Sequence, residues 1–370
     1  MAASPATGDN NPMHTLRLTV DPHSLDDPAS AVALIRAAEI LRHGGLVALP
    51  TETVYGLGAN ALDPAAVARI FHAKDRPSWD PLIVHIAGLP SDSPMLHDLV
   101  SVIPDAAHRL IEAFWPGPLT LLLPRSSAVH DTVTAGRPLV GIRMPAHPVA
   151  ARLIALAGLP IAAPSANRFG HTSPTNAQHV LDDLDGRIDA VLDAGPTHLG
   201  LESTVLDPNT HPMILYRPGA ITAEQIAAVA GPVVPHQPAT SAPAVRPDAP
   251  PDALPSPGVS LRHYAPRARL ILIEAPFAEL PAHLARVAAE HSDEDLGLLL
   301  PRELVGAMPA GAKVFEWGSW NAPETLAQSL YTGLRTLDAA GCAVILCPLP
   351  PEEGLGAALH DRLRKAARPA

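Results

Sequence analysis

Runs of apolar residues alternate with helical patterns in the first two thirds of the chain. The stretch "LVALP" (46–50) is continuously apolar, which is typical of a strand covered on both faces of a sheet. Helical spacing of apolar residues predicts helices at 30–41 and 65–73, and Asp63 and Pro64 supply an N-cap and a first-turn proline for the second. Strands are also predicted at 81–86, within 116–124, and at 139–143, 160–163, 190–193, 203–206 and 213–216. Because the alternation is irregular, we predict an α/β domain with a mixed sheet.

The pattern changes at residue 231. Residues 231–258 are rich in proline and lack an apolar period, which predicts an extended linker. Beyond it, apolar runs in "RLILIEA", "LGLLLP" and "CAVILCP" predict strands, with helices at 278–290, 322–339 and 355–367. We therefore divide the chain into an N-terminal extension (1–28), a first α/β domain (29–230), a linker (231–266) and a smaller α/β domain (267–370).

Composition limits the classes of function. The 370 residues are 47% hydrophobic and 17% charged, enough for sizeable cores and for more than one domain. The net charge of −11 argues against a protein that binds nucleic acid with its whole surface, although a local basic groove is compatible with it. No apolar run reaches 18 residues and the N-terminus lacks a signal-peptide pattern, so we expect a soluble, cytoplasmic protein.

Neither common nucleotide-binding loop is present. Gly56, Gly58 and Ala61 have the spacing of a dinucleotide fingerprint, but the next helix signal, at Asp63 and Pro64, comes too late for one. The chain also contains no Gly-Lys dipeptide, which excludes a Walker A loop. A nucleotide would therefore need another kind of phosphate site.

Two short polar clusters are candidates for such a site. Lys74 and Arg76 in "AKDRP" could converge on a polyanion, or could form an ordinary charged turn at a helix end. In "APSANRFGHTSPT", Ser165 and Asn167 follow a predicted strand, and Ser173 begins a predicted helix. Hydroxyls, an amide and free helix N–H groups suit an anion or a ribose, but also suit turn and capping chemistry.

Seven motifs in sequence order together resemble one family. "ALPTETVYGLGANAL", "AKDRPSWDPLIVHI", "FWPGPLTLLL", "APSANRFGHTSPT", "ESTVLD", "YRPGAI" and "SLRHYAP" are similar to the Sua5/YrdC family of threonylcarbamoyl-AMP synthases. The resemblance covers about 30–230 as a YrdC-like catalytic domain and continues into a Sua5-type C-terminal domain that ends in "GLGAALHDRLRKAA". It implies a twisted mixed sheet with a large concave cavity, a Rossmann-like second domain, and a linker that acts as a lid.

The resemblance also implies a reaction and its participants. L-threonine, bicarbonate and ATP, with Mg²⁺, give L-threonylcarbamoyl-AMP and pyrophosphate, for the t6A37 modification of ANN-decoding tRNAs. A downstream tRNA threonylcarbamoyltransferase complex is the expected partner, with no membrane and no strong direct nucleic-acid binding. Two alternatives remain open, namely an RNA-binding or ribosome-associated module and a carbamoyl-transfer enzyme.

Site residues follow from the motif positions and are likewise implied by the resemblance. The catalytic group is Lys74, Arg76, Ser165 and Asn167. The ATP site is Arg76, Asp80, Leu139, Ser165, Ser173, Arg217 and Tyr264. The L-threonine site is Thr53, His85, Arg143, Ala163 and Ser203, with Arg143 expected to bind the carboxylate through a bidentate pair. No metal ligands are identified. Asp80 departs from the asparagine or histidine that is common in the family, and an anion there would repel phosphates unless a metal ion bridges them or the carboxylate is turned away.

A turn rich in hydroxyls and glycine is expected beside this site. We predict that the strand end at 48–50 carries Thr51 and Thr53 into the cavity, and that Gly56 and Gly58 allow close backbone approach.

Overall fold

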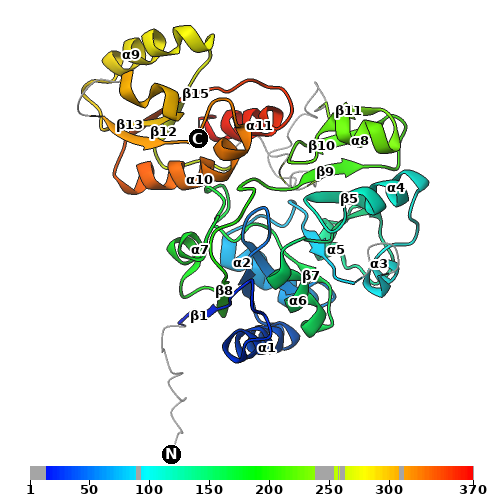
Figure 1. Ribbon diagram of the computed structural model, residues 1–370. Helices are drawn as coiled ribbons and strands as arrows, with labels where there is room; N and C mark the ends of the chain where they lie inside the picture. The colour runs from blue at the N-terminus through cyan, green and yellow to red at the C-terminus, as the bar shows by residue number, and fades with distance from the viewer. Residues whose placement is uncertain are drawn as a thin grey trace, which may run out of the picture.

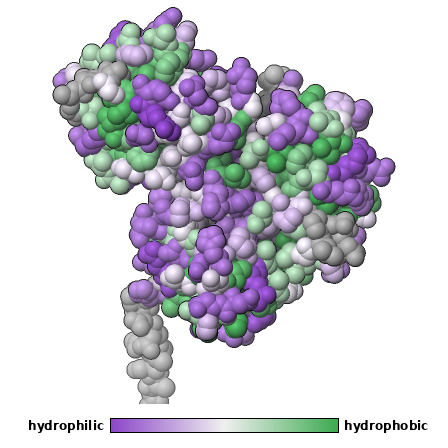
Figure 2. Space-filling view, viewed as in Figure 1, coloured by the Kyte–Doolittle hydropathy of each residue, from purple (hydrophilic) through white to green (hydrophobic). Residues whose placement is uncertain are grey.

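The computed structural model describes residues 14–88, 93–237, 254–256, 258, 263–307 and 312–369. These residues form two α/β units, each built on its own sheet (Figure 1). Within them, no helix combines the length and the apolar character that a membrane span needs. Figure 2 shows hydrophilic side chains spread over both units, with apolar areas as separate patches on the face in view.

The first unit has an eleven-stranded sheet. In spatial order its strands are β1 (Leu16–Thr19), β8 (Ala190–Asp193), β2 (Val47–Leu49), β3 (Gly56–Asn60), β7 (Ile161–Ala162), β4 (Ile83–His85), β6 (Leu139–Arg143), β5 (Leu119–Pro124), β9 (Thr204–Asp207), β10 (Met213–Arg217) and β11 (Val233–Pro235). The sheet contains both parallel and antiparallel pairs, since β4 runs parallel to β6 but antiparallel to β7. The predicted mixed sheet is confirmed.

Helices cover both faces of this sheet. They are α1 (Pro28–Arg42), α2 (Pro64–Lys74), α3 (Pro94–Leu99), α4 (Asp105–Phe114), α5 (Asp131–Thr134), α6 (Pro148–Ala157), α7 (Ala177–Leu184) and α8 (Ala223–Ala230). Strand β2 shows why an apolar run forms here: Val47 and Leu49 join one buried cluster, while Ala48 joins the cluster on the opposite face. Asp63 caps α2 as predicted, because its carboxylate accepts the backbone N–H of Ala65 at 2.9 Å.

The second unit has four parallel strands. In spatial order they are β12 (Arg269–Ile273), β15 (Val344–Pro348), β13 (Leu296–Leu300) and β14 (Lys313–Glu316). Helices α9 (Leu280–Glu290), α10 (Pro323–Ala339) and α11 (Gly356–Ala366) accompany them, with short 3-10 turns at Phe277–Glu279 and Arg302–Ala307. Helices α10 and α11 lie on the side toward the first unit (Figure 1). Cys342 and Cys347 are both buried free thiols.

Strand β3 differs from its prediction as a glycine-rich turn. Residues 56–60 pair with β2 and β7, and glycine is needed there for packing. A Cβ at Gly58 would lie 2.8 Å from Leu49 Cδ2 and 2.9 Å from Ile161 Cγ2. The glycines therefore let three strands approach closely rather than softening a turn.

Edge strands and one helix start also differ from the predictions. Strand β1 lies in the predicted extension and β11 in the predicted linker, and each pairs with an edge of the large sheet. Their short, largely exposed sequences carry little strand signal. Helix α7 begins at Ala177 rather than at Ser173, because the side chain of Asn176 accepts the N–H of His179 at 2.9 Å and caps the helix. Most of the remaining linker, at 238–253, 257 and 259–262, lies outside the described residues.

Candidate functional site

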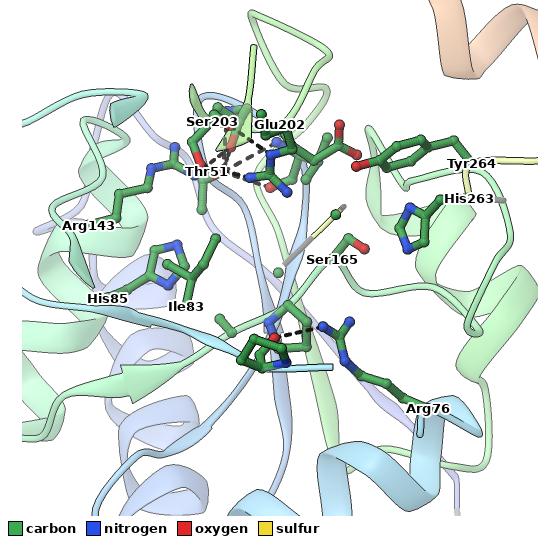
Figure 3. Close-up of a pocket in the computed structure, with 18 residues that line it drawn as sticks. Thr51, Arg76, Ile83, His85, Arg143, Ser165, Glu202, Ser203, His263 and Tyr264 are labelled. Carbon is green, nitrogen blue, oxygen red and sulfur yellow. Dashed lines mark hydrogen bonds between the residues drawn. The ribbon is translucent and has the colours of Figure 1, made fainter. Parts of the chain in front are cut away.

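A pocket opens at the ends of the central strands of the first unit (Figure 3). In this view Arg143 and His85 lie on one side, and Arg76, His263 and Tyr264 lie on the other. Ser165 projects between them. The pocket thus has two chemically different ends.

Thr53 and Arg143 form one end. The loop after β2 carries Thr53, whose hydroxyl oxygen lies 2.7 Å from that of Thr51 and accepts from Arg143 Nη1 at 2.8 Å. Arg143 also forms a buried ion pair with Glu52, with 2.8 Å between Nη2 and Oε1, and donates to the Gly117 carbonyl. A bidentate pair with a substrate carboxylate would therefore require Arg143 to leave Glu52. That role of Arg143 stays a prediction.

His85 lies beside Arg143 because β4 and β6 run parallel with these two residues in register. Burial, together with the positive charge of Arg143, lowers the pKa of His85 to about 3. The imidazole is thus neutral at pH 7. It can offer a hydrogen bond to a small polar ligand, but it is a poor base.

Arg76 forms the opposite end with its neighbour Asp80. Its guanidinium donates to the carbonyls of Asp80 and Pro81, and pairs with the Asp80 carboxylate at 3.0 Å. Burial lowers the pKa of Arg76 and raises that of Asp80, although the charge of each opposes the shift of the other. Arg76 lines the pocket, whereas Asp80 does not. The carboxylate is thus turned toward Arg76 rather than toward a ligand.

Lys74 lies behind the pocket. Its Nζ donates to the backbone carbonyls of Ser165, at 2.5 Å, and Asn167. The side chain is fully buried, and burial, followed by the charge of Arg76, lowers its pKa well below the ordinary range. Asn167 in turn donates to the carbonyls of Arg168 and His171, each at 2.8 Å. The four residues predicted to be catalytic are thus brought together, with Arg76 and Ser165 on the pocket wall and Lys74 and Asn167 holding the loop behind it.

Ser203 and Arg217 close a third side. Arg217 donates to the carbonyl of Ser203 at 2.9 Å and to its hydroxyl at 3.0 Å. The same hydroxyl lies 2.8 Å from the hydroxyl of Thr120 on β5. Strands β9 and β10 therefore fix an arginine and a hydroxyl next to each other at the pocket.

Tyr264 and His263 cover the pocket from the linker. Their rings meet edge to face with centroids 4.1 Å apart. The Tyr264 hydroxyl is buried and has no hydrogen-bond partner among the described residues. Burial raises the pKa of Tyr264, and burial together with the charges of Arg76 and Lys74 lowers that of His263 well below its usual value. A buried phenol without a partner, on the wall of a pocket, is suited to a ligand.

Two predicted residues contact other parts of the fold. Leu139 packs against a buried cluster that contains Ile83, Leu122 and Val205, and does not line the pocket. Ser173 donates to Glu202 Oε1 at 2.5 Å and is likewise absent from the wall. Ala163, by contrast, lies on the wall as expected.

Glu202 and His263 are pocket residues that the sequence analysis missed. Each directly precedes a predicted site residue, in "ESTVLD" and "RHYAP". This position in the sequence was the available sign that they could line the pocket. Burial alone would raise the pKa of Glu202. The positive charges of Arg362 and Arg217 outweigh that effect, so its pKa is lowered. Glu202 is therefore an ionised carboxylate with its own cation.

Cations outnumber anions among the described residues that line the pocket. Arg76, Arg143 and Arg217 line it with one carboxylate, Glu202, while Asp80 and Glu52 pair with the first two arginines from behind the wall. The described ranges contain no group of three His, Cys, Asp or Glu side chains that could hold a metal ion. The pocket can thus hold a polyanion among its arginines and a small polar molecule near Thr53 and His85.

Comparison with known proteins gives matches along almost the whole chain. Residues 39–219 match the family described as "Telomere recombination" (Sua5_yciO_yrdC), and 221–368 match "Threonylcarbamoyl-AMP synthase, C-terminal domain". The chain is 44% identical to the threonylcarbamoyl-AMP synthase of Pyrococcus abyssi, over 90% of this chain and 93% of that protein. It is also 44% identical to the enzyme of the same name from Bacillus subtilis, over 94% and 95%. The crystal structure of P. abyssi Sua5 complexed with L-threonine has a TM-score of 0.84 at 41% identity, covering 95% of this chain and 98% of that one.

Proposed function

Because the chain belongs to the threonylcarbamoyl-AMP synthase family, we propose that it converts L-threonine, bicarbonate and ATP into L-threonylcarbamoyl-AMP and pyrophosphate in this pocket. The observation that carries the proposal is the juxtaposition, within one pocket, of a hydroxyl-lined end at Thr53 and an arginine end at Arg76. A small amino acid fits the first and a triphosphate fits the second.

Threonine is assigned to the end formed by Thr53, His85, Ala163 and Ser203. Arg143 orients the Thr53 hydroxyl and supplies positive charge toward a carboxylate. The complex of the P. abyssi relative with L-threonine supports this choice of ligand.

ATP is assigned to the end formed by Arg76, Ser165, Arg217 and Tyr264. The phenol of Tyr264, which no described residue contacts by a hydrogen bond, and the two guanidinium groups offer donors to phosphate oxygens. Mg²⁺ enters with ATP and is held by its phosphates, because the two acidic groups near this end are already paired, Asp80 with Arg76 and Glu202 with Arg362.

The chemistry consists of two bond-forming steps. The threonine amine attacks bicarbonate to give a carbamate with loss of water, and a carbamate oxygen then attacks the α-phosphorus as pyrophosphate leaves. Phosphoryl chemistry of this kind depends on positioning and charge stabilisation, where one fixed donor contributes about 3–4 kcal/mol. Neither pocket histidine is a suitable base, since both have lowered pKa values. The role left to the chain is to align the reactants and to neutralise the developing charge.

The product is proposed to serve the t6A37 modification of tRNA through a separate threonylcarbamoyltransferase complex in the cytoplasm. With a net charge of −11, the chain is not expected to hold tRNA strongly itself.

The test is pyrophosphate release by the full chain with ATP, Mg²⁺, L-threonine and bicarbonate, each omitted in turn. Release that requires both threonine and bicarbonate is the expected result. Release with threonine alone would instead indicate simple aminoacyl adenylation. No release under any combination would reject the synthase assignment and favour a binding module.

A further inference from the structure

The second unit contacts the pocket of the first through close packing. Val54 and Leu201 of the first unit share a buried cluster with Leu326 and Leu330 of α10. At Gly200, a Cβ would lie 2.5 Å from the Ala327 carbonyl oxygen, so the loop that leads to Glu202 touches the backbone of α10. The two units are therefore fitted to each other beside the site.

Helix α11 adds a buried charge at this junction. Arg362 has no exposed surface, and its Nε donates to Glu202 Oε2 at 2.7 Å. The other carboxylate oxygen accepts the hydroxyls of Ser173, at 2.5 Å, and Tyr331, at 3.1 Å. Glu202 is thus held by two groups of the second unit, and it directly precedes Ser203 of the pocket.

The same helix also contacts the lid, that is, the linker residues Gly258 and Tyr264 that cover the pocket. The guanidinium carbon of Arg362 lies 5.3 Å from the centroid of the Tyr264 ring, within the range of a cation–π contact. One turn further on, Lys365 Nζ donates to the Gly258 carbonyl at 2.6 Å. Gly258 is tightly enclosed, since a Cβ there would lie 2.9 Å from Arg217 Cδ and 3.0 Å from the Tyr264 hydroxyl. Arg362 thus touches both the Glu202 carboxylate and the Tyr264 ring, two parts of the pocket wall.

We propose that Arg362 is a positioning residue for the proposed synthase reaction. Arg362 couples docking of the second unit to closure of Tyr264 over the ATP end. It neutralises Glu202, which would otherwise compete with phosphates for Arg217, and its guanidinium packs over the Tyr264 ring. The inference rests on the proposed function for its kinetic part, whereas its structural part can be tested without turnover.

The decisive variant is the double replacement Arg362→Met with Glu202→Gln. It removes both charges of the buried pair, and Asp361, the other ion partner of Arg362, keeps its 2.7 Å pair with Lys365, so no unpaired ion remains to unfold the protein. We expect a thermal midpoint close to that of the parent, with KM for ATP raised about tenfold and a smaller change in kcat. The single variant Arg362→Met should raise KM for ATP further, because the unpaired Glu202 carboxylate then faces Arg217.

The matched control is Arg364→Met on the same helix. The side chain of Arg364 is half exposed and lies 3.7 Å from Glu274. This variant should behave like the parent.

Amide hydrogen exchange supplies the second readout. The N–H of Ala265 donates to the Gly170 carbonyl at 2.9 Å, so its protection reports attachment of the lid. We expect faster exchange at Ala265 in the double variant, without substrates, and parental exchange in Arg364→Met.

A double variant with parental KM for ATP would overturn the proposal and leave the pair with a purely stabilising role. Parental exchange at Ala265 would reject the lid contact, whatever the turnover. Absence of pyrophosphate release from the parent protein would instead count against the synthase assignment, and would leave the exchange experiment interpretable.

Discussion

Arg76 and Asp80 form one buried ion pair, but only the arginine reaches the pocket. Loss of either partner breaks the ion pair, and loss of Arg76 also removes its hydrogen bonds to the carbonyls of Asp80 and Pro81. Where the two variants fold equally well, a difference in activity between them reports the contact of Arg76 with substrate.

We predict that Arg76→Met lowers kcat for pyrophosphate release about a hundredfold, because a fixed positive charge at the developing anion is lost. Asp80→Asn keeps the cation and removes the competing anion, so its kcat should stay within about threefold of the parent. Steady-state assays with both variants, after a check of folding by circular dichroism, provide the measurement. Equal losses in the two variants would show that Arg76 acts only through the ion pair.

For single residues, motif positions predicted much of the pocket wall, including Thr53, Arg76 and Arg217. They could not predict that Lys74 lies behind the wall, because its two carbonyl partners depend on how the 165–167 loop folds back. Nor could they identify the state of Glu202, whose cation lies 160 residues away along the chain.

Strand β3 shows how glycine can be required within a regular element. Its neighbours Leu49 and Ile161 fill the space where a side chain at Gly58 would lie. A larger residue at this position would therefore overlap with both neighbouring strands.

We predict that Gly58→Ala lowers the free energy of unfolding by about 1–3 kcal/mol through overpacking, despite the lower chain entropy of alanine. Urea denaturation measures the change. Gly306→Ala is the control, since a Cβ there meets no atom of the described residues within 4 Å, and it should be neutral or slightly stabilising. Similar destabilisation in both variants would contradict the packing argument.

Elements in the interior were the ones that the apolar pattern predicted well, as with β6 at 139–143 and β8 at 190–193. Strands β1 and β14 escaped prediction because each is four residues long and mostly exposed, so the hydrophobic signal is weak. Strand β3 escaped it because its glycines serve tertiary packing, which outweighs their low strand propensity.

Buried neutral histidines give the whole molecule a dependence on pH. Burial lowers the pKa of His85 to about 3 and the pKa values of His147 and His179 to about 4, against about 6.5 in an unfolded chain. Below pH 6.5 the unfolded state therefore binds protons that the folded state does not. Stability is fully present above that pH and is lost as the pH falls toward 4.

We predict that the free energy of unfolding declines between pH 6 and 5, each such histidine contributing up to about 1.4 kcal/mol per pH unit. Urea midpoints at the two pH values provide the measurement. His147→Asn should make the decline shallower, because asparagine retains the capping function that His147 provides at Val149 without a titratable ring. An unchanged slope would show that His147 also binds its proton in the folded state.

The pair between Glu202 and Arg362 also imposes an order on biosynthesis. The ribosome makes the first unit, with its pocket strands, well before it reaches α11, so a nascent chain carries the Glu202 carboxylate without its counterion. The site reaches its final electrostatic state only after the second unit has been translated and has docked. Premature termination before Arg362 would thus yield a protein with most of the pocket residues but without the buried counterion that Glu202 has in the full chain.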